Sequence, residues 1–100
     1  MAGILDLVGN TPIVELQNIS ANKNVTIYGK LEGNNPGGSV KDRAAFGMIK
    51  GALDRGEIKE GFTLIEATSG NTGIALAMIA SLFKLPIELV MPEILPENAF

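Results

Sequence analysis

Residues 63–90, TLIEATSGNTGIALAMIASLFKLPIELV, determine the fold class of this chain. The run begins with Thr63 to Ala67, a short segment whose apolar and β-branched residues predict a mostly buried strand. After it, Thr68 to Thr72 predicts a tight loop, Gly73 to about Phe83 an apolar helix, and Pro86 to Val90 another strand. A strand, a helix and a strand with short connections are typical of a parallel α/β sheet.

The same alternation extends toward the amino end. Residues 25–31, VTIYGKL, alternate apolar and polar side chains, which predicts a strand. In Gly33 to Gly38 we expect a loop without any regular element, because glycine tolerates positive φ and proline fixes φ. A helix follows up to Gly56, with Ser39 as its cap and Asp42 as the acidic member of a capping box. The fold class is therefore α/β, with a partial parallel sheet and flanking helices.

The first residues predict smaller elements. Ile4 to Val8 is expected to form a short helix that ends at Gly9, and the residues from Gly9 to Pro12 predict a turn. Ile13 to Leu16 then predicts a short strand.

The composition limits the possible functions. Hydrophobic residues make up 46% of the chain and charged residues only 19%, below the roughly 25% of ordinary domains, so we expect further chain or another subunit to cover part of the apolar surface. A net charge of −3 with scattered basic residues argues against a nucleic-acid partner. Because the chain has neither cysteine nor histidine, no disulfide and no metal site is predicted.

A membrane location is not expected either. The longest apolar stretch, Ile74 to Phe83, is shorter than the about 20 residues that a membrane-spanning helix needs. The amino end carries no basic leader typical of a signal peptide. We therefore expect a soluble cytoplasmic protein without a membrane partner.

Lys41 is a candidate catalytic residue because of its position in the first turn of the predicted helix. The helix dipole disfavours a cation there by a few tenths of a kcal/mol, so stability alone would favour an acidic residue. The same field favours the neutral amine, which is the form that attacks an aldehyde to make a Schiff base. A solvated surface lysine would show the same spacing, so the residues alone leave both interpretations open.

The loop from Thr68 to Thr72 is a candidate anion site. It joins the carboxyl end of a strand to the amino end of a helix, where free backbone N–H groups and up to three hydroxyls meet. Phosphate and carboxylate both fit such a site. The alternative is an ordinary capping loop in which Ser69, Asn71 or Thr72 is the N-cap. The loop lacks the G-x-x-x-x-G-K pattern of a nucleotide-binding P-loop.

Taken together, the two loops resemble those of one enzyme family. NNPGGSVKDRAA (34–45) is similar to the cofactor-lysine segment of fold-type II (β-family) pyridoxal-phosphate enzymes, and EATSGNTGIALA (66–77) is similar to their substrate loop. GNTP (9–12) resembles their usual opening. The similarity is nearest to the cysteine synthase (O-acetylserine sulfhydrylase) family and its B-type branch, and it extends from about Leu7 to Pro92.

The resemblance implies pyridoxal 5'-phosphate as the cofactor and assigns roles to single residues. Lys41 would hold the cofactor as a Schiff base and then move the α-proton of the substrate, and Asn71 would hydrogen-bond the cofactor's ring oxygen. The α-carboxylate of the substrate would be bound by Thr68, Ser69, Gly70, Asn71 and Thr72. A separate Gly/Thr-rich loop for the cofactor phosphate, and the residue that meets the pyridine nitrogen, would lie outside this chain.

The resemblance also implies the start of a two-domain enzyme with the tryptophan synthase β-like fold. Residues 1–12 and 35–100 would form the first part of the smaller α/β domain, which carries the substrate loop. The strands in residues 13–34 would belong to the larger cofactor domain. Because related enzymes are much longer, we expect the 100 residues to be a fragment that is inactive alone. The full-length protein is expected to be a homodimer.

The implied reaction is a β-replacement that makes L-cysteine from O-acetylserine and sulfide or a related sulfur nucleophile. The lysine segment alone does not determine the leaving group, so a cystathionine β-synthase-like or threonine dehydratase-like enzyme is an alternative. A non-catalytic fragment or binding module is another.

Other residues have simpler interpretations. Asp42 and Arg43 are expected to be a helix cap and a surface charge, although Asp42 would also be placed to steady the loop. Met48, Met78 and Phe83 are expected in the core.

Overall fold

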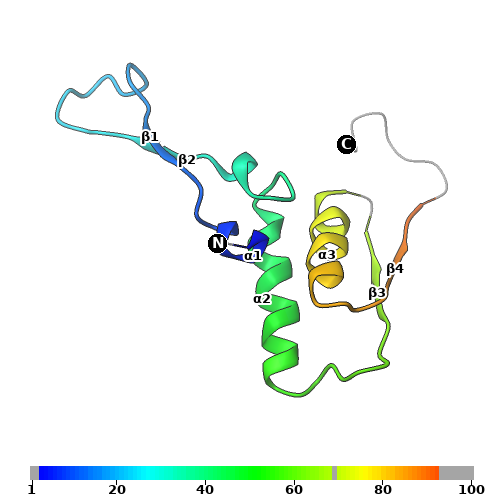
Figure 1. Ribbon diagram of the computed structural model, residues 1–100. Coiled ribbons are helices and arrows are strands. Elements are labelled where there is room, and N and C mark those ends of the chain that lie inside the picture. The colour runs from blue at the N-terminus through cyan, green and yellow to red at the C-terminus, as the bar shows by residue number, and fades with distance from the viewer. Residues whose placement is uncertain (1–2, 69, 93–100) are drawn as a thin grey trace.

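The computed structural model describes residues 3–68 and 70–92 of the chain. In this part the predicted α/β class is confirmed, with short strands and helices in alternation (Figure 1). The elements in chain order are α1 (Ile4–Leu7), β1 (Ile13–Glu15), β2 (Tyr28–Lys30), the 3-10 turn η1 (Glu32–Asn34), α2 (Lys41–Asp54), β3 (Leu64–Ala67), α3 (Asn71–Leu82) and β4 (Ile87–Val90).

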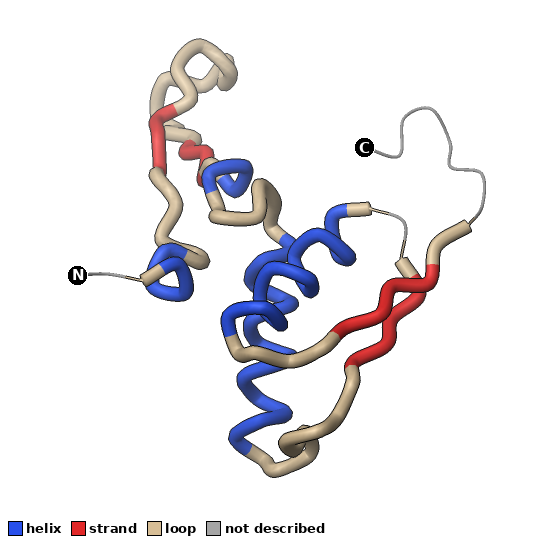
Figure 2. Tube along the Cα trace, turned by 45° about the vertical axis from the view of Figure 1, so that its right-hand side comes forward, coloured by secondary structure: helices blue, strands red, loops and turns tan. Residues whose placement is uncertain are grey.

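The predicted strand-helix-strand unit is formed by β3, α3 and β4. β3 and β4 pair in parallel, with Leu64 opposite Ile87 and Ala67 opposite Val90. A backbone hydrogen bond continues the ladder past the carboxyl end of β3, since the Thr68 N–H donates to the Val90 carbonyl at 2.9 Å. Figure 2 shows the two strands side by side, with α3 connecting the end of one to the start of the other.

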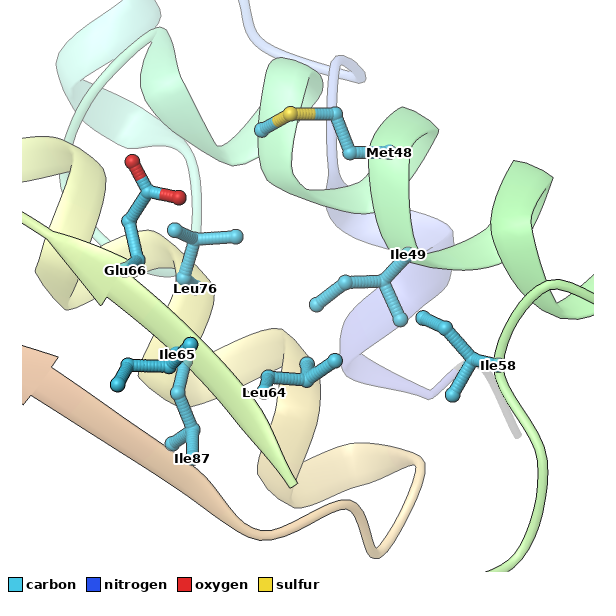
Figure 3. Close-up of a pocket in the computed structure, with 8 residues that line it drawn as sticks. All are labelled: Met48, Ile49, Ile58, Leu64, Ile65, Glu66, Leu76 and Ile87. Carbon is cyan, nitrogen blue, oxygen red and sulfur yellow. The ribbon is translucent and has the colours of Figure 1, made fainter. Parts of the chain in front are cut away.

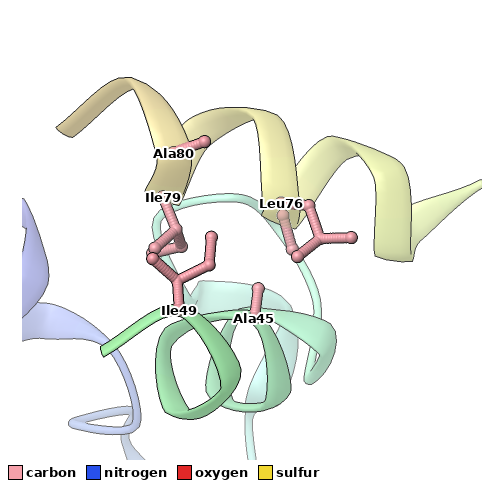
Figure 4. Packing of buried hydrophobic residues seen from close by; sticks show 6 residues of the cluster. Ala45, Ile49, Leu76, Ile79 and Ala80 are labelled. Atoms are coloured by element: carbon pink, nitrogen blue, oxygen red, sulfur yellow. The ribbon is translucent and has the colours of Figure 1, made fainter. Parts of the chain in front are cut away.

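The core lies mainly between α2 and α3. Ala45 and Ile49 of α2 pack against a buried stripe of α3, in which Ile79 and Ala80 have no exposed surface (Figure 4). The small alanine side chains allow the two helices to approach closely. Figure 1 shows that α2 and α3 begin at the same end of this pair, near the carboxyl ends of β3 and β4. The core therefore places two helix amino ends beside each other.

The strands β1 and β2 form a separate antiparallel pair, with Ile13 opposite Lys30. The prediction that residues 25–31 begin the parallel sheet is therefore wrong. β2 is also shorter than predicted, because the Val25 N–H donates to the Asn22 carbonyl in a turn that replaces strand pairing. Figures 1 and 2 show this pair extending away from the helices beyond the end at which α2 begins.

The loop before α2 contains a regular element that we did not expect. The turn η1 forms although Gly33 lies in its middle, because the Asn34 N–H donates to Leu31 O at 3.0 Å and the Asn35 N–H to Glu32 O at 3.2 Å. The Asn35 side chain also donates to Glu32 O, which stabilises the turn further. Local side-chain bonding thus outweighs the flexibility of glycine.

The prediction that Thr63 to Ala67 is mostly buried is wrong in this structure. Three of the four β3 residues are exposed, and Ile65 has 66% of its surface accessible. Figure 3 shows Ile65 and Leu64 beside an apolar pocket that Met48 of α2 also lines. The composition led us to expect such an apolar surface, and what covers it stays a prediction.

None of the helices in residues 3–68 and 70–92 has the length and apolar character that a membrane span requires. The same residues contain no group of three or more acidic, histidine or cysteine side chains arranged to hold a metal ion.

Candidate functional site

Two helix amino ends form the candidate site. α2 begins at Lys41 and α3 at Asn71, and both side chains are exposed. Figure 1 shows these two helix starts at the same end of the packed helix pair. The N–H groups in the first turn of a helix have no partner within the helix and carry partial positive charge. The arrangement thus combines an accessible amine and an accessible amide with backbone donors suited to an anion.

The strand-to-helix loop brings most of the predicted substrate residues together. Thr68 and Gly70 follow β3, and Asn71 and Thr72 form the first turn of α3. Thr68, Gly70 and Thr72 are partly buried, whereas Asn71 is exposed. Ser69 lies outside the described residues, so its predicted role stays a prediction.

Thr68 caps α3. Its Oγ1 accepts a hydrogen bond from the Gly73 N–H at 3.1 Å, in a position that the capping interpretation had assigned to Ser69, Asn71 or Thr72. The Thr68 hydroxyl keeps its proton, which it can donate to a ligand. Gly73 is required for this contact, since a Cβ there would lie 2.6 Å from Thr68 Cγ2. The capping bond thus orients one of the predicted carboxylate-binding hydroxyls.

The start of α2 differs from the predicted capping box. The N-cap residue is Val40 and not the predicted Ser39, although Ser39 Oγ accepts the Lys41 N–H at 3.2 Å. The Asp42 carboxyl group does not reach back to Ser39, and its Oδ2 instead accepts the Gly37 N–H at 2.5 Å. The capping box is therefore wrong, and Asp42 steadies the loop, which was the second interpretation of this residue.

A polar network joins the amino-terminal turn to α2. We call it the Glu32 network, and its members are Gly9, Thr11, Glu32, Asn35 and Arg43. Arg43 donates to both carboxylate oxygens of Glu32, at 2.9 and 2.7 Å, and to the Gly9 carbonyl at 2.9 Å. Asn35 accepts the Gly9 N–H at 2.8 Å and donates to Glu32 at 2.7 Å. Arg43 is therefore more than the surface charge that we predicted.

The network has a clear electrostatic consequence for Glu32. Hydrogen bonds from Arg43, and then from Asn35, lower the pKa of the Glu32 carboxyl group from its ordinary value of 4.5 to about 2. The same ion pair raises the pKa of Arg43. Both groups therefore stay charged at neutral pH, and the network holds the loop before Lys41 against the amino-terminal turn.

We expect the Glu32 network to make the free energy of unfolding depend on pH in the acid range. The folded-state pKa of Glu32 lies below its ordinary value, so the stabilisation is fully present above about pH 4.5 and is lost as the pH falls through about 2. Urea unfolding of the wild type and of Glu32→Gln from pH 7 downward should show a difference that shrinks below pH 4.5. Glu57, whose pKa is also lowered, is present in both proteins, so its contribution to the pH dependence cancels when one free energy of unfolding is subtracted from the other. A difference that does not depend on pH would contradict the role of the Glu32 charge.

Sequence reasoning missed Glu32 and Asn35 as contributors to this region. Glu32 is 11 residues from Arg43, and Asn35 is 26 residues from Gly9. No helical or strand periodicity connects residues at these separations, so only the folded chain reveals the network. Glu32 and Asn35 belong to no motif or periodic pattern in the sequence that would indicate their partners.

The comparisons with known proteins identify the family of this chain. A family model described as pyridoxal-phosphate dependent enzyme matches residues 4–99. Cysteine synthase B of Salmonella typhimurium is 62% identical over 86 residues, covering 86% of this chain and 28% of the relative. Cysteine synthase B of Escherichia coli is 57% identical over 93 residues, covering 93% of this chain and 31% of the relative.

A solved structure supports the fold as well. O-acetyl serine sulfhydrylase isoform 3 of Entamoeba histolytica matches with a TM-score of 0.87 and 44% identity, covering 96% of this chain and 30% of that chain. The chain thus spans between 28% and 31% of the length of these three proteins.

Proposed function

Because this chain belongs to the family of pyridoxal-phosphate dependent enzymes, we propose that it forms part of an enzyme that makes L-cysteine from O-acetylserine and sulfide or a related sulfur donor. The observation that carries the proposal is the pairing of an exposed Lys41 at the start of α2 with the anion-suited start of α3 at the same end of the helix pair. The relatives named cysteine synthase B, at 62% and 57% identity, support the choice of reaction.

The chemistry of the donor set fits pyridoxal phosphate. Lys41 offers an accessible amine for an imine bond to the cofactor aldehyde, and Asn71 offers an accessible amide for the ring oxygen. When bound, the cofactor supplies an electron sink that stabilises negative charge at the substrate Cα. The protein's own part is to orient both partners and to move protons.

The start of α3 is proposed to hold the substrate carboxylate. The Thr68 hydroxyl is oriented by its bond to Gly73, and the first N–H groups of the helix point toward the same end. The proposed carboxylate site consists of Thr68, Ser69, Gly70, Asn71 and Thr72. A carboxylate placed there would bring the amino group and Cα of the substrate toward Lys41.

The proposed reaction exchanges one substituent on Cβ. The Cβ–O bond to acetate breaks and a Cβ–S bond forms, so the substrate undergoes no net oxidation. Lys41 takes the proton from Cα and returns it at the end, which is general acid-base catalysis by a positioned amine. Hydrosulfide enters with one negative charge and acetate leaves with one, so the exchange balances and the S–H proton stays on the cysteine product.

Three broader features belong to the same proposal. We place residues 1–12 and 35–100 in the smaller domain and residues 13–34 in the cofactor domain, because the structure contains two separate sheets. A homodimer, which the family resemblance implies, and a cytoplasmic location are the other two features.

The test compares substrates on the complete protein. We expect cysteine from O-acetylserine with sulfide at a kcat/KM well above that for serine with homocysteine or for threonine. Borohydride reduction followed by peptide mapping should place the cofactor adduct on Lys41. Preferred turnover of serine or threonine would replace the proposal by the cystathionine β-synthase-like or threonine dehydratase-like alternative. No turnover and no adduct would favour a non-catalytic binding module.

A further inference from the structure

We propose that Asp42 is a positioning residue for Lys41: its buried carboxyl group fixes the turn at Gly37 and thereby holds the first turn of α2 in place beside the start of α3. The inference rests on the role proposed above for Lys41. It differs from that role, since Asp42 itself is not expected to touch substrate or cofactor.

The burial of Asp42 is the first observation. It directly follows Lys41, yet none of its surface is exposed, whereas the Lys41 side chain is exposed. An acidic residue in the first turn of a helix is favourable at the surface and needs no burial to interact with the dipole. Complete burial of this carboxyl group therefore requires another explanation.

The position of Asp42 on α2 is the second observation. Asp42, Ala45 and Ile49 are the buried residues of α2, and their spacing of three and four places them on one face of the helix. Ala45 and Ile49 of that face pack in the core with α3. Asp42 therefore continues the α3-facing stripe to the end of the helix at which Lys41 is placed.

The contact with Gly37 is the third observation. Asp42 Oδ2 accepts the Gly37 N–H at 2.5 Å, across five residues of the loop. The fit is tight, because a Cβ on Gly37 would overlap with the Asp42 carboxyl group. The loop and the helix start are thus joined by one hydrogen bond at a point with no room for a side chain at position 37, and Lys41 lies between them in sequence.

The other carboxyl oxygen argues for a function beyond stability. Asp42 Oδ1 is buried and has no hydrogen-bond partner in the described part of the chain. An unpaired buried oxygen is unfavourable, so stability alone would favour a different residue here. Buried polar atoms without a partner break the usual rule of hydrogen-bond satisfaction, and such exceptions are expected where a functional site requires a defined geometry.

The experiment measures how fast Lys41 captures the cofactor. The complete apoprotein is mixed with pyridoxal phosphate, reduced with borohydride at increasing times, and the fraction of modified Lys41 is determined by peptide mass spectrometry. We expect Asp42→Ala to slow the capture about tenfold, as loss of one hydrogen bond implies. Asp42→Asn keeps an oxygen acceptor for the Gly37 N–H and should restore most of the rate. Asp54→Ala, at the exposed end of the same helix, is the matched control and should capture at the wild-type rate.

A double-mutant cycle separates positioning from simple loss of stability. Gly37→Ala should slow capture by a similar factor, because the new Cβ overlaps with the Asp42 carboxyl group. Combining Gly37→Ala with Asp42→Ala removes that overlap, so the double variant should be no slower than either single variant. Gly33→Ala, whose Cβ would meet nothing within 4 Å, is the control and should combine additively with Asp42→Ala.

The outcomes distinguish this inference from the function on which it rests. A wild-type protein that places no adduct on Lys41 would overturn the proposed function. If the wild type captures normally, then unchanged capture in Asp42→Ala, or additive effects of Gly37→Ala and Asp42→Ala, would overturn the positioning role. Melting temperatures recorded beside the rates identify any variant that fails to fold. If Asp42→Ala does not fold, the capture rate of Asp42→Asn, which keeps the acceptor, tests the positioning role in its place.

Discussion

Lys41→Ala is expected to abolish covalent attachment of the cofactor and to reduce turnover of O-acetylserine by about 10²–10⁴-fold or more. The substitution removes the only atom of this residue that can form the imine bond and the amine that is proposed to move the α-proton. The backbone should be retained, because the side chain is exposed and the residue lies at a helix start. Steady-state kinetics and borohydride mapping of the complete protein are the two measurements.

Lys50→Ala is the matched control for this prediction. Lys50 lies on the same helix, is exposed, and pairs with Asp54 at 2.8 Å in an i,i+4 arrangement. Such a surface pair contributes little to stability. Turnover should therefore remain close to the wild-type value. A Lys41→Ala variant that still carries the cofactor adduct, or that keeps full turnover, would show that another lysine is the reactive amine.

The largest effect on stability is expected for Ile79→Ala. Ile79 has no exposed surface and lies in the cluster that joins α3 to α2 (Figure 4). Truncation of a buried isoleucine removes apolar contacts and leaves a cavity, so the free energy of unfolding should fall by about 2–5 kcal/mol. The packing of these two helices also sets the relative positions of Lys41 and Asn71 at their amino ends. We therefore expect weaker cofactor binding together with the loss of stability.

Ile74→Ala tests whether burial causes that effect. Ile74 is on the same helix, but 45% of it is exposed, so the loss should be about 1 kcal/mol or less. Urea unfolding of both variants at the same saturating cofactor concentration gives the comparison, since a bound ligand also shifts apparent stability. Equal losses for the two variants would contradict the location of the core between α2 and α3.

Local patterns predicted most of the regular elements. The apolar spacing from Val40 to Leu53 and the glycine at Gly56 agree with α2, which ends at Asp54. Gly56 has a φ of +74°, a conformation that suits a helix end. Information of this kind lies within a few neighbouring residues, so the sequence is sufficient to read it.

The errors have a common origin in contacts between distant residues. The partner of β2 is β1 and not β3, and no pattern within residues 25–31 distinguishes the two choices. The exposure of Ile65 depends on which other elements cover β3. Asp42 was predicted to bind Ser39, but the folded loop presents Gly37 to it instead.

The sequence by itself determined the two candidate loops, the candidate lysine between a glycine-rich turn and a helix, and the α/β class, because each is encoded by residue types at short spacing. Only the tertiary structure decided that the α2 and α3 amino ends lie at the same end of the helix pair, that Arg43 bonds both Glu32 and the Gly9 carbonyl, and that Asp42 is buried. The physical reason is that helix packing and long-range hydrogen bonds depend on the positions of residues far apart in the chain, which no local pattern records.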